Sequence, residues 1–459
     1  MNTRFPCETR KITLVARGSV LAIFATSLLP ATVWAGTDDD AGRVKIAQAF
    51  AQRLAKGKFD EATERFDETM KKVLPEEKLR QLWTSLSGQS GGFKSFGEPT
   101  TAKVGAHDVV YIPAEFGSTD LSLKVVFDHK NRITGFFVEP AREAAITPTY
   151  QPPGYDRQNR YTEKDVEFGE ERWRVKGKLT IPNTRNLAPA VVLVHGSGPH
   201  DEDETIGPNK PFRDLAAGLS SNGIAVLRYQ KRTHAHQLKL VAKKTITVHE
   251  EVIDDALAAL AFLREEAPVN KGRIYLLGHS LGATLAPQIA YEDKKLAGVI
   301  MLAGTPRDFC EVIEEQLAYI SSLPGPNQAA NKKIYEDSRD IIARYRAGKL
   351  GSDAVLLGPP VSYWNEISEY GRKSLDVAKQ LKCRMLIVNG GRDYQVTKKD
   401  YDLYRGALKD QEHVTFKWHE DLNHLFMTGK GKATPAEYAK AGHVDSAVID
   451  RLVMWIKSK

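Results

Sequence analysis

Residues 274–290 have the sequence IYLLGHSLGATLAPQIA. Their apolar start predicts a short buried strand, and the run from Ala283 onward predicts a helix. The turn between them is Gly278-His279-Ser280-Leu281-Gly282, a G-x-S-x-G motif in the strand–turn–helix setting that supports a nucleophilic serine. Its glycines remove side chains that would collide where strand and helix approach. The segment therefore predicts a strained Ser280 whose exposed hydroxyl lies at the head of a helix, where the helix dipole favours a developing anion.

Apolar strands alternate with helical stretches on both sides of this segment. Short, continuous apolar runs separated by helices indicate a parallel sheet that is covered on both faces. We expect an antiparallel pair to precede it, at Val166–Phe168 and Trp173–Ile181. The sequence thus predicts the α/β class, with a doubly wound, mostly parallel sheet. The predicted parallel strands are Ala190–Val194, Ile224–Tyr229, Ile274–Leu277, Gly298–Leu302, Met385–Val388 and Val414–Trp418.

A catalytic serine needs a general base and an acid that orients the base, because its free hydroxyl is a poor nucleophile. Asp393 lies in the turn after the strand at 385–388, and His424 lies in the loop beyond the strand at 414–418. The chain order Ser280, Asp393, His424 is one in which such triads occur. These three residues are the predicted catalytic set.

Other residues compete for two of these roles. His413 precedes the last strand and His419 follows it, and His424 is preferred because of its place in the loop beyond. Asp400 is the nearest downstream alternative to Asp393. It falls in the next predicted helix, and we expect it to be exposed.

A tetrahedral intermediate also needs hydrogen-bond donors for its oxyanion. One predicted donor is the backbone N–H of Leu281, the residue after the nucleophile. The other should come from the glycine-rich loop His195-Gly196-Ser197-Gly198-Pro199, which follows the strand at 190–194. Ser197 N–H is the first choice there, and Gly198 N–H is the alternative.

The same loop continues with an acidic run that could hold a metal ion or a substrate ammonium group. Basic residues end the following strand at the same sheet edge, and we favour a salt-bridge network between the two segments. No metal site is predicted, because hard cations need converging oxygens that this pattern does not establish. No nucleotide-binding or paired-cysteine motif is present either. The acidic run includes Asp201, Asp203 and Glu204, and the basic residues are Arg228, Lys231 and Arg232.

Residues 307–381 interrupt the alternation of strands and helices. They hold helical patterns at Glu311–Ser321 and Ala330–Ala347, followed by the aromatic residues Tyr363 and Trp364. Ligands of open α/β sheets bind outside the carboxyl ends of the strands. We therefore expect the insertion to form a cap over the site, with Tyr363 and Trp364 in the substrate pocket. The alternative is that these are structural helices without a part in binding.

The two cysteines of the mature chain are expected to remain unpaired. Cys310 follows the end of one predicted parallel strand, whereas Cys383 opens the next. They should therefore lie at opposite edges of the sheet, about 15 Å or more apart. A disulfide requires Cα atoms within about 7 Å of each other.

The N-terminal segment is typical of a secretory signal peptide, residues 1–35. A basic region precedes an uncharged apolar stretch from Val20 to Leu29, which is too short for a membrane-spanning helix. Small residues around Ala35 predict cleavage after it. The mature protein is therefore expected to be periplasmic or secreted, with no stable membrane insertion after cleavage.

The remaining chain divides by pattern into two folded parts. Residues 36–145 predict a small α+β accessory domain, residues 146–155 a proline-containing linker, and residues 156–459 the domain that carries the triad. A length of 459 residues suits two or three domains. The net charge of +7 is a small excess, so nucleic acid is not a predicted partner.

Several segments give the chain a resemblance to the α/β-hydrolase superfamily, near the secreted bacterial esterases of the dienelactone hydrolase and prolyl oligopeptidase-like branches. The resemblance implies a small-molecule ester substrate, an acyl-enzyme intermediate and no cofactor, with the triad and oxyanion roles given above. The N-terminal part resembles a small uncharacterised α+β domain that often precedes such hydrolases. The matching segments are His195–Pro199, Leu227–Thr233, Gly278–Gly282, Gly391–Val396 and Leu422–Phe426.

Two alternatives to an ester hydrolase stay open from the sequence. The first is a serine aminopeptidase or short-peptide hydrolase, in which the acidic run after Pro199 would hold a substrate ammonium group. Prolyl oligopeptidases carry a β-propeller, and residues 36–145 are too few to form one. The second is a binding protein on the same fold, against which a complete triad argues.

Overall fold

The computed structural model describes residues 38–458, apart from 90, 105–106, 118–119, 141–149, 237–238, 241–242, 244, 266 and 326–327. The predicted signal peptide lies outside the described residues, as does much of the predicted linker. Among the helices that the structure describes, none combines the length and the apolar character needed to cross a membrane.

The N-terminal part is built from four helices and an antiparallel sheet. The sheet has the order β1-β3-β4-β5, and β2 pairs with the other part of β3. The helices pack their apolar side chains on one face of the sheet, around Phe50, Leu54 and Trp83. The elements are α1 (Asp38–Ala55), α2 (Phe59–Thr63), α3 (Glu68–Val73), α4 (Glu76–Gln89), β1 (Phe93–Phe96), β2 (Thr100–Val104), β3 (His107–Phe116), β4 (Asp120–Phe127) and β5 (Ile133–Pro140).

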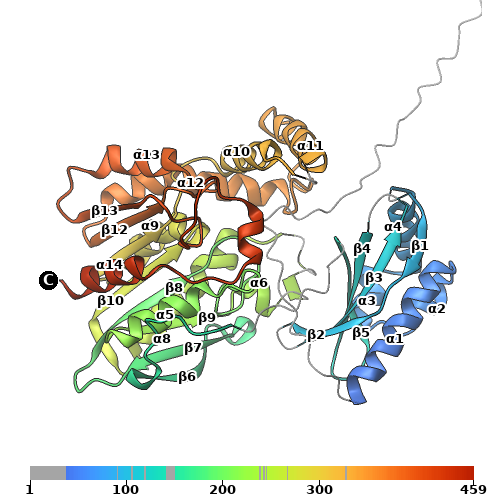
Figure 1. Ribbon diagram of the computed structural model, residues 1–459, viewed down its shortest axis with the longest axis horizontal. Helices are drawn as coiled ribbons and strands as arrows, with labels where there is room; N and C mark the ends of the chain where they lie inside the picture. The colour runs from blue at the N-terminus through green and yellow to red at the C-terminus, as the bar shows by residue number, and fades with distance from the viewer. Residues whose placement is uncertain are drawn as a thin grey trace, which may run out of the picture.

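The second sheet has eight strands in the order β13-β12-β11-β10-β8-β9-β7-β6 (Figure 1). Neighbours from β13 to β9 are parallel, and β7 and β6 complete the sheet as an antiparallel pair. The prediction of a mostly parallel sheet with an antiparallel entry is therefore confirmed. The strands are β6 (Tyr161–Phe168), β7 (Val175–Pro182), β8 (Ala188–Val194), β9 (Ala225–Tyr229), β10 (Val269–His279), β11 (Gly298–Leu302), β12 (Arg384–Gly390) and β13 (Val414–His419).

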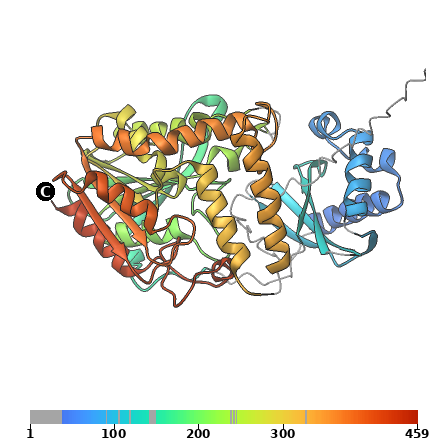
Figure 2. The same cartoon turned by 90° about the horizontal axis from the view of Figure 1, so that it is seen from above.

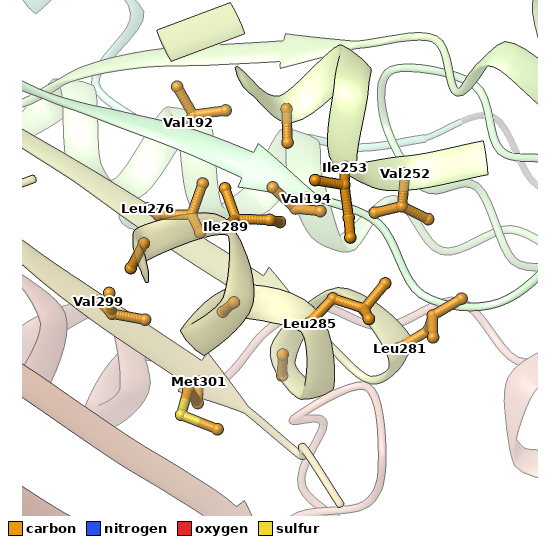
Figure 3. Close-up of a cluster of buried hydrophobic side chains, with 14 of the residues drawn as sticks. Val192, Val194, Val252, Ile253, Leu276, Leu281, Leu285, Ile289, Val299 and Met301 are labelled. Carbon is orange, nitrogen blue, oxygen red and sulfur yellow. The ribbon is translucent and has the colours of Figure 1, made fainter. Parts of the chain in front are cut away.

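Helices cover this sheet on both faces, which explains why its central strands are apolar throughout. Successive strand residues point to opposite faces. Val192 and Leu276 therefore pack against one helical layer, and Val191 and Leu277 pack against the other. Figure 3 shows the first of these cores, where side chains of α9 meet those of the strands. The first layer includes α8 (Asp254–Glu265), α9 (Leu281–Asp293) and α13 (Lys398–Leu408), and the second is α5 (Pro211–Ser221) with α14 (Ser446–Lys457).

The segment between β11 and β12 forms three helices, α10 (Phe309–Ser322), α11 (Gln328–Arg346) and α12 (Val361–Gln380). The first two match the predicted helical patterns to within three residues at each end. They lie side by side, and Figure 2 shows this pair beyond the sheet. Cys310 lies in the first turn of α10 and Cys383 precedes β12, and both are free thiols, in line with the sequence expectation.

Candidate active site

Ser280 lies between β10 and α9 in a conformation that few L-residues adopt, with φ 54° and ψ −114°. The two flanking glycines make this turn possible. A Cβ atom on Gly278 would lie 2.2 Å from the carbonyl oxygen of Gly282, and one on Gly282 would lie 2.2 Å from the carbonyl oxygen of Val194. Strain of this kind persists only where the surrounding structure enforces it. The local geometry is thus that of a serine held outward at a tight strand-to-helix turn.

Asp393 and His424 lie in contact beyond the neighbouring strands. His424 Nδ1 is 2.7 Å from Asp393 Oδ2, and both residues are buried. The other carboxylate oxygen of Asp393 accepts the backbone N–H groups of Gln395 and Val396, at 2.7 and 3.0 Å. Because Asp393 holds the Nδ1 proton, Nε2 of His424 is left as the basic nitrogen.

The serine and the histidine are brought near each other through His279. Nε2 of His279 donates to the carbonyl oxygen of His424 at 2.9 Å, and the two imidazole rings are 4.8 Å apart. Within the described residues, no hydrogen bond joins Ser280 Oγ to His424 Nε2. Such bonds are often long in an empty site and tighten when substrate binds.

The two predicted oxyanion donors share a pocket with Ser280. Ser197 and Leu281 both line it, and Leu281 is the first residue of α9, so its N–H has no partner inside the helix. The glycine-rich loop can approach closely because a Cβ atom on Gly196 would lie only 3.1 Å from Ser280 Cβ. His200 Nε2 holds the carbonyl oxygen of Ser197 at 2.7 Å. The two residues that carry the predicted donors therefore line the same pocket as Ser280.

One wall of this pocket is a face of helix α10. Phe309, Val312, Ile313 and Gln316 follow the i, i+3, i+4, i+7 spacing of a helix face, and all four line the pocket. The sequence predicted that the insertion containing this helix caps the site, but it did not single out these four residues as pocket lining. The rest of the lining is Thr284, Thr305, Gln395 and Val396.

Tyr363 and Trp364 lie away from this pocket, contrary to the prediction. Both are buried in the core beneath α12, with 3% and 2% of their surface exposed. The indole N–H of Trp364 donates to the carbonyl oxygen of Leu356, and the hydroxyl of Tyr363 donates to Glu251. The aromatic pair therefore fixes α12 to the body of the domain, and it is α10 that borders the pocket.

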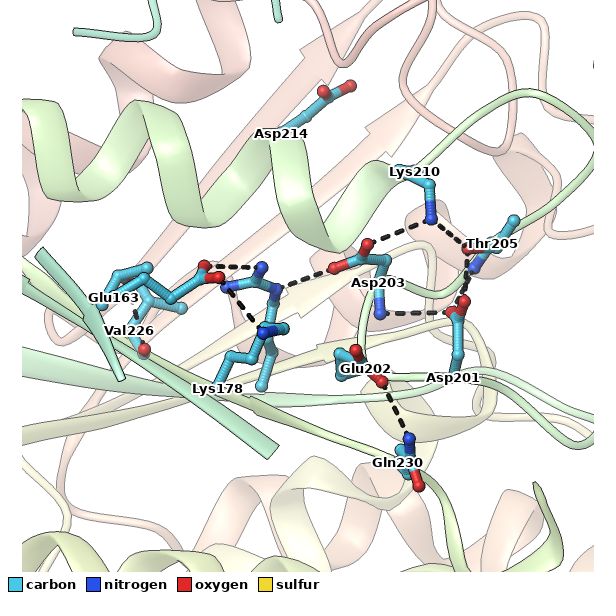
Figure 4. A network of polar contacts seen from close by, with 12 residues as sticks. Glu163, Lys178, Asp201, Glu202, Asp203, Thr205, Lys210, Asp214, Val226 and Gln230 are labelled. Carbon is cyan, nitrogen blue, oxygen red and sulfur yellow. Dashed lines mark hydrogen bonds and ion pairs between the residues drawn. The ribbon is translucent and has the colours of Figure 1, made fainter. Parts of the chain in front are cut away.

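The acidic run after Pro199 forms a network with basic residues, as expected (Figure 4). Asp203 accepts from Arg228 at 2.9 Å and from Lys210 at 3.1 Å, and Asp201 is held by Thr205 at 2.7 Å. Across the described part of the chain, no group of three or more His, Cys, Asp or Glu side chains is arranged to hold a metal ion. The carboxylates of this run serve to fix the loop.

The predicted partners of Lys231 and Arg232 were wrong. Lys231 pairs with Glu251 and Arg232 with Asp255, and in both pairs the nitrogen–oxygen distance is 2.5 Å. Both acids lie on the helical segment before β10, in the π-helical turn η3 (His249–Ile253) and at the start of α8. Nothing near Lys231 or Arg232 in the sequence indicates that these two acids are their partners.

Glu204 forms a buried pair with His279 that sequence reasoning did not single out. Its Oε2 lies 2.9 Å from His279 Nδ1, and its Oε1 accepts the backbone N–H of Gly196 at 2.6 Å. Burial raises the pKa of Glu204, but the charge of His279 and its hydrogen bond, together with the nearby His200 and His195, outweigh burial and lower that pKa to about 2. Burial lowers the pKa of His279, and attraction to Glu204 reverses this into a net rise. The pair therefore joins the glycine-rich loop to the serine turn.

Asp400 is fully buried, where the sequence suggested exposure. It accepts from Thr305 Oγ1 at 2.5 Å and from Arg307 Nε at 2.8 Å, and its other oxygen caps the start of α13. An acid at the third helical position usually faces solvent. Here it anchors the segment before α10, and because both of its oxygens are engaged there, it does not compete with Asp393.

Comparison with known proteins agrees with this architecture. Residues 186–430 match the family model described as serine aminopeptidase, S33, and residues 47–136 match the model of a protein of unknown function, DUF3887. The esterase EstD of Thermotoga maritima is 38% identical over 436 residues, which cover 95% of this chain and 99% of that protein.

The solved structures with a similar backbone are less similar to this chain in sequence than EstD is. An esterase of Pyrococcus furiosus, Pf2001, is 18% identical with a TM-score of 0.42, covering 67% of this chain and 97% of that one. Carboxyl esterase 2 of Tuber melanosporum is 18% identical with a TM-score of 0.43, covering 67% and 89%. The assignment depends instead on the strand order, the family model and the curated relative. Because the model spans more than half of the chain and the relative nearly all of it, the chain belongs to the α/β-hydrolase family described as serine aminopeptidase, S33.

Proposed function

We propose that this protein is a serine hydrolase of carboxylic esters. The observation that carries the proposal is the strained Ser280, which shares a pocket with Ser197 and Leu281, while the adjacent His279 contacts a His424 that Asp393 holds. The 38% identity to an esterase over nearly the whole chain supports the same activity. The roles below follow from the geometry of these groups.

In the first step Ser280 Oγ attacks the acyl carbon while His424 Nε2 takes its proton. The carbonyl oxygen of the ester becomes an oxyanion, which the N–H groups of Ser197 and Leu281 stabilise. His424 then gives the proton to the leaving alcohol, and an acyl-enzyme remains on Ser280. Water attacks this intermediate by the same route, with His424 again as the base. Asp393 keeps the imidazole in the required tautomer throughout.

The pocket favours substrates whose acyl or alcohol group is largely apolar. Phe309, Val312 and Ile313 present carbon atoms to it, whereas Gln316 and Gln395 supply amide groups at one end. Gln316 Nε2 is itself held by the carbonyl oxygen of Gln395 at 3.1 Å. No charged side chain is among the lining residues that the structure describes. A neutral ester therefore fits this surface better than a charged one.

A serine aminopeptidase is the second candidate, because the matching family model carries that description. Such an enzyme needs a carboxylate free to bind the substrate ammonium group. Asp203 is already paired with Arg228 and Lys210, Glu204 is paired with His279, and Asp201 accepts hydrogen bonds from Thr205 with both oxygens. The acids that the sequence offered for this role are thus engaged, which favours the ester. Comparing p-nitrophenyl acyl esters with aminoacyl anilides as substrates decides between the two.

We also propose that the protein is exported, with cleavage after Ala35. The support is the basic region followed by an apolar stretch in residues 1–35. Expression of the full chain in a bacterial host, followed by N-terminal sequencing of the protein in each cell fraction, tests this. A mature N-terminus at Gly36 in the periplasm or medium agrees with the proposal, and an intact Met1 in the cytoplasm contradicts it.

The central experiment compares the wild-type protein with Ser280→Ala on p-nitrophenyl acetate and with a fluorophosphonate probe. We expect kcat to fall by about 10⁴-fold or more, because the nucleophile is lost, and labelling to disappear. Ser322→Ala is the matched control, since Ser322 is an exposed serine at the end of α10. Ester hydrolysis by purified Ser280→Ala at close to the wild-type rate would overturn the mechanism.

A further inference from the structure

Buried charged side chains hold the glycine-rich loop on both sides of Gly196. The backbone N–H of Gly196 donates to Glu204, as described above, and its carbonyl oxygen accepts from Lys231 Nζ at 2.9 Å. Lys231 follows β9 and is 2% exposed. Removing such a charge from water is costly unless it is well paired, so a buried ammonium group directed at a backbone carbonyl points to a role for that contact.

The geometry of the peptide bond indicates what this role is. The carbonyl group of Gly196 and the N–H group of Ser197 belong to the same planar trans peptide, in which they point in opposite directions. Lys231 binds this peptide from the carbonyl side. The N–H of Ser197 must therefore point away from Lys231, and Ser197 lines the pocket that contains Ser280. Lys231 thus fixes the direction of one predicted oxyanion donor without touching the pocket.

Lys231 is itself held by a second buried residue. Glu251 Oε1 lies 2.5 Å from Lys231 Nζ, and its Oε2 accepts the hydroxyl of Tyr363 from helix α12. Glu251 lies in η3, a single π-helical turn before α8. π-Helical turns are rare in proteins as a whole, and those that do occur are often found at functional sites. Tyr363, Glu251 and Lys231 therefore connect the insertion to the glycine-rich loop beside Ser280.

We propose that Lys231 is a positioning residue for the oxyanion hole, which it orients and polarises through the carbonyl of Gly196, and that Glu251 and Tyr363 connect it to helix α12. The proposal rests on the proposed hydrolase function. A positive charge at the carbonyl end of a peptide makes its N–H a stronger donor in a buried setting. Lys231 should therefore stabilise the transition state, in which the oxyanion carries charge, more than it stabilises the bound ester.

Lys231→Met tests this, because it removes the charge and the donor while keeping an unbranched chain. Losing an oxyanion donor costs about 10²–10³-fold in kcat, so a donor that is kept but no longer fixed should cost about 10- to 100-fold. We expect this fall in kcat for p-nitrophenyl acetate with KM nearly unchanged. The affinity for a phenylboronic acid, which forms a tetrahedral adduct with the serine, should fall with kcat.

Arg232→Met is the matched control. Arg232 is the next residue, is buried to a similar extent and has its own buried acid, Asp255, but has no contact with the glycine-rich loop in the part of the chain that the structure describes. The Arg232→Met substitution should lower the melting temperature as much as Lys231→Met does, yet leave kcat and boronate affinity near the wild-type values. A folded Lys231→Met protein with wild-type kcat and boronate affinity would overturn the proposal.

Three milder variants cover the case in which Lys231→Met does not fold. Lys231→Arg keeps the charge and should retain more kcat than Lys231→Gln, which keeps a donor without the charge. Tyr363→Phe removes only the hydroxyl that holds Glu251 and should lower kcat by a few-fold at unchanged KM. Equal kcat for the wild-type protein and all three variants contradicts the proposal.

The rate of Ser280 labelling by a fluorophosphonate separates this proposal from the proposed function. Labelling also places a negatively charged oxygen in the oxyanion hole. If the wild-type protein cleaves no ester, the proposed substrate is wrong. Slower labelling of Lys231→Met than of Arg232→Met would still support the role of Lys231, and equal labelling would refute it.

Discussion

Replacing Glu204 by glutamine should destabilise the protein in a way that depends on pH. The glutamine amide can still accept the N–H of Gly196, but it leaves His279 without a counter-charge. The pKa of Glu204 falls from 4.5 to about 2 on folding, because its interactions with His279, and with His200 and His195 to a smaller extent, together outweigh burial. At about 1.36 kcal/mol per pKa unit, the charged carboxylate contributes about 3 kcal/mol to the free energy of unfolding.

The sign of the dependence follows from the two partners. A carboxyl group with a lowered pKa stabilises the fold above its unfolded value of 4.5, and this contribution is lost as the pH falls toward 2. An imidazole with a raised pKa stabilises the fold below 6.5, and its contribution is lost as the pH rises through the raised value. The difference between the wild-type protein and Glu204→Gln should therefore be largest between about pH 4.5 and 6.5.

Urea unfolding at pH 3, 5.5 and 8, followed by tryptophan fluorescence and circular dichroism, measures this difference. The denaturant slope should be the same for both proteins, so that the midpoint reports stability alone. Glu202→Gln is the control. Burial raises the pKa of Glu202, so that neutralising this neighbour should leave stability unchanged or raise it. An equal loss at pH 3 and pH 5.5, or no loss at pH 5.5, would refute the account of the pair.

Three further substitutions probe the turn, the insertion and the pocket. Gly282→Ala places a Cβ atom 2.2 Å from the carbonyl oxygen of Val194, and because backbone cannot move aside easily, it should cost about 1–3 kcal/mol in urea unfolding and lower ester turnover. Trp364→Ala should lower the melting temperature, with a cost of about 3–5 kcal/mol for a buried aromatic residue, and leave the preference for acyl chain length unchanged. A changed preference would return Trp364 to the pocket. Val312→Phe should fill the space beside α10 and reduce kcat/KM for butyl and hexyl esters more than for the acetyl ester; a uniform effect across the p-nitrophenyl series would contradict the pocket assignment.

The parts of the structure that the sequence predicted correctly are those specified by short segments. The strand at Gly298–Leu302 has the predicted bounds, because a short, continuous apolar run is typical of a strand that helices cover on both faces of the sheet. The turn at Ser280 was predicted because the G-x-S-x-G motif lies within five residues, although the carbonyl oxygen that excludes a side chain at Gly282 belongs to the distant Val194. The places of Asp393 and His424 followed from the strands before them, since each lies in the first loop after its strand.

The parts that were missed depend on contacts between distant segments. Asp400 is buried because Arg307, 93 residues away, pairs with it, and nothing near Asp400 in the sequence indicates that partner. Periodicity showed that α12 has a buried face, but it could not show whether the core or the pocket covers that face. Tyr363 was therefore predicted to line the substrate pocket, whereas its hydroxyl donates a hydrogen bond to the buried Glu251. The pairing of Lys231 with Gly196 spans 35 residues and was not foreseen for the same reason.

The place where the insertion joins the sheet has a consequence for how such enzymes diversify. It leaves after Leu302 and returns at Arg384, on strands that are hydrogen-bonded neighbours. Ser280, Asp393 and His424 all lie outside it, whereas α10 inside it lines the pocket, so a cassette grafted between these two strands should alter the substrate range and leave the three residues in place. The contact of Tyr363 with Glu251 sets one condition on such an exchange. A grafted cassette that lacks a hydroxyl at that position should give an enzyme that is slow on every ester, whatever its new preference.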